Sequence, residues 1–139
     1  MSNERYTIVV SGERLVFTRD QIESDPGNYF ATYFFGEFAE GTRGIRELAV
    51  EKDVRLFRLI QAHLRGYSIL PLAPAAIPPY MTMEGALANL LTEAQYYSLQ
   101  LLEEKIRDFL SHDASTKLRK DAVRTYKFAV SLPELTVVS

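Results

Sequence analysis

The chain has 139 residues, of which 47% are hydrophobic and 24% charged, with a formal net charge of −2 and no cysteine. This length and composition predict one folded domain and exclude disulfide-stapled, collagen-like and disordered classes. The nearly balanced charge makes nucleic-acid binding an unfavoured function. No apolar run reaches the roughly 18 residues needed to span a bilayer, and the N-terminal residues lack the apolar run of a secretory signal. We therefore expect an intracellular protein, cytoplasmic or nuclear, without membrane association.

The first segments predict a β-hairpin followed by a short helix. Residues 6–10 are rich in β-formers and residues 14–18 alternate in polarity, with a glycine-containing turn between them. Thr18 and Gln21 have the Thr-x-x-Gln spacing of a capping box, in which each side chain satisfies a backbone N–H at the start of a helix. The Pro-Gly pair at residues 26–27 predicts where this helix has ended.

The next segment is unusually dense in aromatic residues. Asn28 is an expected N-cap of a helix that ends at Gly36. Six of the chain's sixteen aromatic residues lie within ten positions: Tyr29, Phe30, Tyr33, Phe34, Phe35 and Phe38. Because a helix buries only part of its circumference against one small domain, two interpretations are open. Either the helix is buried all round, or some of its rings face another chain.

A strand and a strongly amphipathic helix are predicted after a loop at residues 37–44. Residues 46–50 predict the strand, and Asp53 is the expected N-cap of the helix, which Gly66 closes. Four of the six prolines fall within residues 71–79, which predicts an extended connection to the second half of the chain.

The second half is predicted to be helical. Thr92 and Gln95 repeat the capping-box spacing and predict a helix start, and apolar residues at helical spacing carry that helix to Leu110. Residues 112–139 are interpreted as a partly ordered C-terminal tail, so the domain is expected to span residues 5–111.

We find no constellation typical of an enzyme or a metal site. His63 and His112 are far apart and have no cysteine to support them, so we interpret His63 as a structural residue near the core. Residues 36–43 have the glycine spacing of a phosphate loop, but they lack its lysine and carry two glutamates. Paired carboxylates, as at residues 103–104, lack a partner that would indicate acid–base chemistry. We expect no catalytic residue, no metal and no cofactor.

A short basic cluster at residues 117–120 leaves an alternative function open. Its simpler interpretation is a charged tail that keeps the chain in solution. The alternative is a transcription-associated module whose basic tail contacts nucleic acid or directs nuclear import.

Four stretches follow each other in the order of a known family's motifs. Residues 6–18 resemble its opening strand, glycine turn and Phe-x-Thr, and residues 51–57 its Asp-Arg-Asp-Pro-x-x-Phe. Residues 63–66 resemble Tyr-Leu-Arg-x-Gly, and residues 93–99 fit Glu-Ala-x-Tyr-Tyr-x-Leu closely. The family is the BTB/POZ domain, in its potassium-channel-tetramerisation branch, and residues 10–22 also resemble fungal BTB proteins.

This resemblance implies an α+β fold, with a small mixed sheet of short strands flanked by a cluster of α-helices. It also implies a homo-oligomerising adaptor, whose second surface can engage a cullin scaffold of ubiquitin ligases. The self-association surface implied by the family comprises Arg14, Asp20, Glu51, Lys52, Asp53 and Arg65. The partner-binding surface comprises Tyr33, Phe34, Phe35 and Phe38, with the segment after Gly66.

Overall fold

The structure is a computed structural model that describes residues 4–37 and 44–113. The chain divides into two compact units, Met1–Ile106 and Arg107–Ser139; in the second, residues 107–113 are helical. The elements described in the first unit are β1 (Arg5–Val10), β2 (Glu13–Thr18), α1 (Arg19–Glu23), α2 (Tyr29–Phe35), β3 (Glu47–Val50), α3 (Val54–Leu64), the 3₁₀ turn η2 (Pro74–Ala76) and α4 (Met83–Tyr96), followed by helical residues 100–106. The α+β class expected from the sequence is confirmed.

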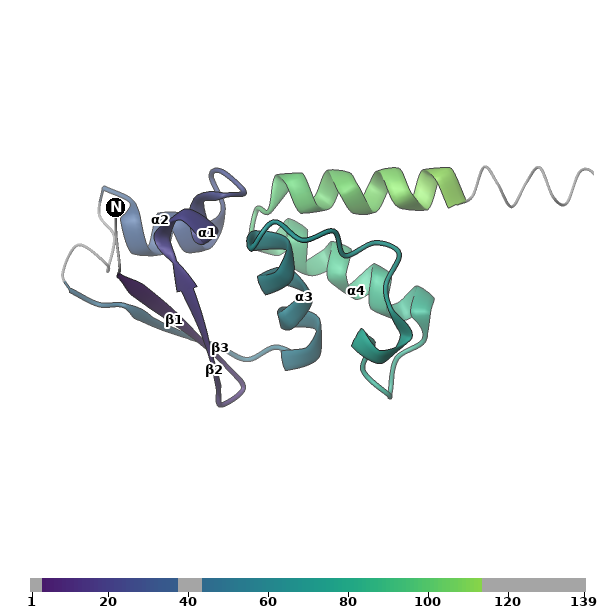
Figure 1. Cartoon of the computed structure of the whole chain (residues 1–139), viewed down its shortest axis with the longest axis horizontal. Coiled ribbons are helices and arrows are strands. Elements are labelled where there is room, and N and C mark those ends of the chain that lie inside the picture. Colours follow the sequence, from purple (N-terminus) through teal and green to yellow (C-terminus); the bar gives the residue numbers. More distant parts are fainter. Residues whose placement is uncertain (1–3, 38–43, 114–139) are drawn as a thin grey trace, which may run out of the picture. The chain divides into compact units, whose positions relative to one another are not determined.

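The three described strands form one small sheet in the order β2-β1-β3 (Figure 1). The central strand β1 pairs antiparallel with β2 and parallel with β3, and Ile8 is opposite both Leu15 and Leu48. One face of the sheet is packed into the core through side chains that alternate along the strands: Tyr6, Ile8, Val10, Leu15 and Phe17. The side chains between them lie on the other face, as the alternation predicts.

Three helix starts expected from the sequence are confirmed. The Thr18 hydroxyl accepts from the Gln21 N–H and the Gln21 side chain accepts from the Thr18 N–H, which completes the capping box of α1. The side chain of Asn28 caps α2, and that of Asp53 caps α3 by accepting from the Leu56 N–H at 3.0 Å. Each of these caps is formed within four residues of sequence.

The aromatic helix α2 is buried on one side only. Phe30 and Phe34 are fully buried, and the Phe30 ring packs on Tyr97 with 4.6 Å between centroids. Tyr29, in contrast, is 43% exposed, while Tyr33 and the last ring of the helix are half-buried. Of the two open interpretations, complete burial is therefore wrong.

The predicted helix start at Thr92 is wrong. Helix α4 begins at Met83 and is capped by Thr82, whose hydroxyl accepts from the Gly85 N–H at 2.9 Å. Thr92 lies inside α4, where its hydroxyl donates to the carbonyl of Ala88. The Thr-x-x-Gln spacing is compatible with both places, because threonine inside a helix can bond back to the carbonyl four residues earlier.

The predicted continuous helix is also interrupted, at Ser98. Ser98 has φ of 56°, its N–H donates to the Gln95 carbonyl, and the Leu99 N–H donates to the Ala94 carbonyl at 2.8 Å. This pair of bonds is a Schellman motif, in which a left-handed residue ends a helix. The end predicted at Leu110 is likewise too early, since all described residues of the second unit, 107–113, are helical.

A buried carboxylate organises the turn between α1 and α2. Asp25 is fully buried and accepts from the backbone N–H groups of Leu101 and Leu102, both at 3.1 Å. The His63 Nε2 atom lies 2.7 Å from the same carboxylate, and burial lowers the pKa of this imidazole. Asp25 thus accepts hydrogen bonds from two N–H groups at the start of the helical segment that follows residue 99. His63 is a structural histidine.

Candidate protein-binding surfaces

The sheet presents one face that no described helix covers, here called the outer sheet face. It comprises the side chains of Thr7, Val9, Arg14, Val16, Glu47 and Ala49. Val16 is 40% exposed, and Thr7 and Val9 on the central strand are only half-buried. Apolar side chains at the centre of an open sheet face are typical of a surface that another chain can cover.

Two exposed ion pairs involve strands of the sheet, and only the pair between Arg14 and Glu47 lies on the outer sheet face. Arg14 pairs with Glu47 across the sheet, and Arg58 of α3 pairs with Glu13 of β2 at 2.8 Å. All four side chains are about half exposed, so each pair contributes little to folding, about 0–1 kcal/mol. Such pairs can be rearranged at small cost when a partner brings charges of its own.

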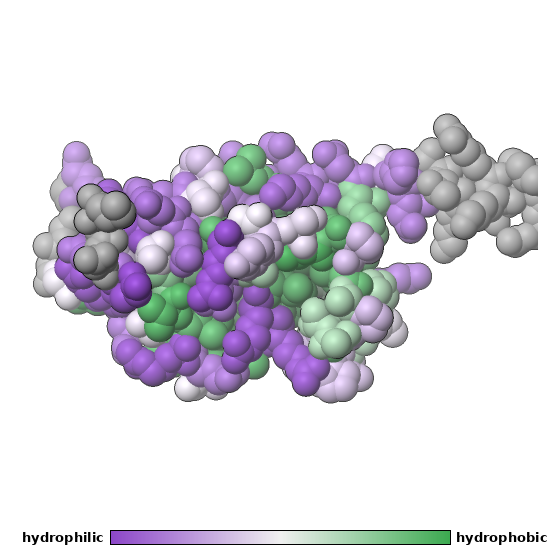
Figure 2. All heavy atoms as spheres, viewed as in Figure 1, coloured by the Kyte–Doolittle hydropathy of each residue, from purple (hydrophilic) through white to green (hydrophobic). Residues whose placement is uncertain are grey.

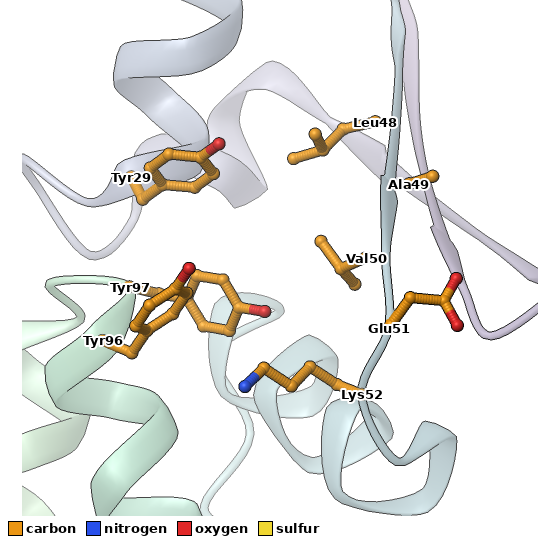
Figure 3. A pocket seen from close by; sticks show the side chains of 8 residues that line it. All are labelled: Tyr29, Leu48, Ala49, Val50, Glu51, Lys52, Tyr96 and Tyr97. Carbon is orange, nitrogen blue, oxygen red and sulfur yellow. The ribbon is translucent and has the colours of Figure 1, made fainter.

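The residues implied for self-association do not share one surface. Arg14 lies on the outer sheet face, and the Glu51 side chain points to the same side as Ala49 (Figure 3). Asp53 caps α3, and Lys52 points away from Glu51. The remaining two, Asp20 in α1 and Arg65 after α3, are exposed.

The residues implied for partner binding also separate. Phe34 is 1% exposed and packs on Tyr6 with 5.1 Å between ring centroids, so it belongs to the core and is not available to a partner. Phe35 is half-buried between Tyr6 and Arg19, whose guanidinium lies 4.3 Å from the ring centroid. Tyr33 is half-buried, and Phe38 lies outside the described residues.

Exposed hydrophobic residues occur among hydrophilic ones at the surface of the described chain (Figure 2). Four of the strongly exposed ones are tyrosines: Tyr29, Tyr67, Tyr80 and Tyr96. Tyr67 directly follows Gly66 and is 64% exposed. Tyrosine is enriched in interfaces because its ring is apolar and its hydroxyl can remain hydrogen-bonded.

Two of these tyrosines line a groove beside β3, here called the β3 groove (Figure 3). Its volume is about 380 Å³, and its lining residues are Tyr29, Leu48, Ala49, Val50, Glu51, Lys52, Tyr96 and Tyr97. The Tyr29 N–H donates to the Tyr97 carbonyl at 2.8 Å, which joins the start of α2 to the end of α4. Leu48 and Val50 point across the groove toward the tyrosines. Sequence reasoning missed this groove because its walls come from segments far apart in the chain.

The β3 groove has an unusual charge environment. The Lys52 Nζ atom lies 5.0 Å from the centroid of the Tyr96 ring, a cation–π distance. Glu93 of α4 is 8% exposed and its Oε1 atom is buried without a hydrogen-bond partner among the described residues. Burial raises the pKa of Glu93 to about 7, although Lys52 acts in the opposite direction. Burial also raises the pKa of Tyr97, so its phenol stays protonated.

The described residues give little support for a metal site or a membrane-spanning helix. Residues 4–37 and 44–113 contain no group of three or more His, Asp or Glu side chains placed to hold a metal ion. The same residues include no helix long and apolar enough to cross a membrane. The basic cluster at residues 117–120, and with it the predicted nucleic-acid or import role, lies outside the described residues, as does most of the loop at 36–43.

Comparison with known proteins does not identify a family. The chain matches no model of a protein family, and no curated protein is significantly similar to it in sequence. The resemblance to BTB/POZ domains therefore rests on the motifs themselves.

Proposed function

We propose that this chain is a protein–protein interaction module that assembles with copies of itself, as BTB/POZ domains of the potassium-channel-tetramerisation branch do, and that it acts as an adaptor. The observation that carries the proposal is the outer sheet face, where half-buried and exposed apolar side chains lie beside the Arg14–Glu47 ion pair. A second copy that covered Val9 and Val16 would remove their apolar surface from water and pack a second layer against the open face of the sheet.

The positions of the motif residues support the BTB/POZ comparison. The Ser11 hydroxyl donates to the Lys52 carbonyl at 2.6 Å, so the hairpin turn of the first motif meets the second. Phe57 of the second motif and Tyr97 of the fourth are both buried and lie 6.0 Å apart between ring centroids. The motif stretches thus meet in one core, as expected of motifs that specify a fold.

Substitution on the outer sheet face tests self-association. Val16→Lys places a charge in the proposed interface, whereas Met83→Lys places the same charge at a position that is also 40% exposed but lies on α4. Burying an unpaired charge between subunits costs about 3 kcal/mol or more, equivalent to about a 100-fold weaker association. Light scattering should show V16K dissociating at concentrations where M83K remains assembled. Equal behaviour of the two variants contradicts this assignment of the interface.

Engagement of a cullin scaffold is the narrower part of the proposal. It is supported by the half-buried Tyr33 and by Tyr67, which is well exposed directly after the motif that ends at Gly66. Pull-down with a purified cullin N-terminal region measures it, with Tyr67→Ala as the disrupting variant and Tyr80→Ala, at a similarly exposed tyrosine, as the control. Absence of binding removes the cullin claim and leaves self-association standing.

A further inference from the structure

One edge of β3 has backbone groups without partners in the described chain. The Arg46 carbonyl accepts from the Thr7 N–H at 2.9 Å, and the Val50 carbonyl accepts from the Ser11 N–H at 3.0 Å. Since alternate residues of a parallel strand face the same neighbour, the backbone groups of Ala49 point away from β1. Within residues 4–37 and 44–113, no backbone hydrogen bond satisfies them. An edge of this kind is a template for an added strand.

The β3 groove runs along this open edge. Figure 3 shows Leu48 and Val50 pointing into the groove, with Tyr29 and Tyr96 on the opposite wall. The two tyrosines are 43% and 69% exposed, so their rings are available for contact. An added strand would pair with the backbone of β3 and place alternate side chains between these rings and the apolar floor.

The charge at the end of the groove selects among possible segments. Lys52 is half-buried, and no carboxylate of the described residues forms an ion pair with it; the neighbouring Glu51 side chain points away from the groove. Glu93 compensates this charge poorly, because burial raises its pKa to about 7 and favours its neutral form. An acidic side chain from outside complements the ammonium.

We propose that the β3 groove binds an extended acidic peptide segment of a partner protein, which adds to the open edge of β3 as a further strand and places a carboxylate against Lys52. This deepens the proposed function, because it names the chemistry of a partner for an interaction module. It does not require self-association, since the strand would add at the free edge of β3, and Leu48 and Val50, which point into the groove, are not part of the outer sheet face.

Selection from a random peptide library displayed on phage tests the proposal on the full chain. Selection on the unmodified chain should enrich peptides that alternate apolar residues and carry Asp or Glu at a fixed position. Selection on Lys52→Glu should enrich Lys or Arg at that position. Arg55→Glu is the matched control, because Arg55 is exposed, lies on α3 and does not line the groove.

Binding of the best enriched synthetic peptide then measures the contribution of each feature. K52E should weaken it by about 30-fold or more, the loss typical of a buried charge pair, and R55E should change it little. Ala49→Pro removes the outward N–H while the hydrogen bonds to β1 remain, so this variant should fold and lose peptide binding. Circular dichroism checks folding. No enriched peptide, or binding that neither K52E nor A49P reduces, overturns the proposal.

Hydrogen exchange at single amides distinguishes other occupants of the edge and does not depend on any variant. In the unbound full chain the Ala49 N–H should exchange freely, and the peptide should protect it. Protection in the free chain at every concentration would mean that another part of this chain occupies the edge, and protection that grows with concentration would mean that a second copy does. Either result overturns the proposal of a separate partner. A chain that remains monomeric yet binds the peptide removes self-association alone.

Discussion

Replacing Glu93 by glutamine should stabilise the chain at alkaline pH and not in acid. Glu93 is 8% exposed, and one of its carboxylate oxygens is buried without a partner among the described residues. Burial raises the pKa of this carboxyl from 4.5 to about 7 in the folded chain. The folded state therefore holds the proton more tightly than the unfolded state does, and stability falls as the pH rises between these two values.

The size of the effect follows from the two pKa values. At about 1.4 kcal/mol per pKa unit, the interval from 4.5 to about 7 corresponds to about 3 kcal/mol of lost stability between acid and pH 8. Glutamine carries no charge at any pH and so avoids this loss. Its amide is a polar group at the same buried position, which costs about 1 kcal/mol or more if it finds no partner. The gain at pH 8 should therefore be about 1–3 kcal/mol.

Urea unfolding followed by circular dichroism at several pH values measures this directly. The difference in unfolding free energy between Glu93→Gln and the unmodified chain should grow from pH 5 to pH 8. In this difference, the contributions of groups that titrate alike in both proteins, such as His63, cancel. Glu104→Gln, at an exposed position, is the control and should give a flat difference. A difference that does not change with pH for Glu93→Gln refutes the reasoning.

Three further substitutions test how the helices after residue 82 are held. Asp25→Ala should cost about 3 kcal/mol or more in urea unfolding, because it leaves the N–H groups of Leu101 and Leu102 without their acceptor; an unchanged midpoint contradicts this role. Ser98→Gly should increase the free energy of unfolding by about 0.5 kcal/mol and so raise the melting temperature slightly. Glycine relieves the left-handed strain at this position, although it also increases the entropy of the unfolded chain. Ala88→Gly, within α4 and exposed, should instead cost about 1 kcal/mol, and the opposite order of these two glycine variants would contradict the helix-end assignment.

The predictions that the structure confirms concern features contained in a few neighbouring residues. The capping box at Thr18 and the N-caps Asn28 and Asp53 each depend on a side chain and an N–H three residues apart, so the sequence contains all of the interaction. Gly66, with φ of 89°, likewise ends α3 as expected, because glycine adopts this conformation without strain.

The errors arise where distant residues decide the structure. Ser98 ends α4 in the left-handed conformation that glycine usually adopts. The burial of Leu99 and Ala94 stabilises this conformation, and no local sequence pattern predicts that burial. The helical residues after Ser98 are capped by Asp25, far away in the sequence. Thr92 has the spacing of a cap but lies inside a helix that begins earlier in the chain, at Met83.

The candidate surfaces were only partly predictable for the same reason. The density of rings in α2 left open whether some are exposed, and which ones are depends on contacts such as the packing of Phe34 against Tyr6. The open edge of β3 depends on its being the last strand in the order β2-β1-β3, a property of topology. The groove then requires Tyr96, from the other end of the domain, to lie opposite that edge.

The mass of the assembly in solution tests the central claim most directly. Light scattering across a concentration series from about 1 to 100 μM, the range in which moderate self-association is populated, needs no assumption about the interface. The account predicts a mass of at least twice the 15.8 kDa of one chain at the upper end of the series. A mass of one chain at every concentration would contradict it.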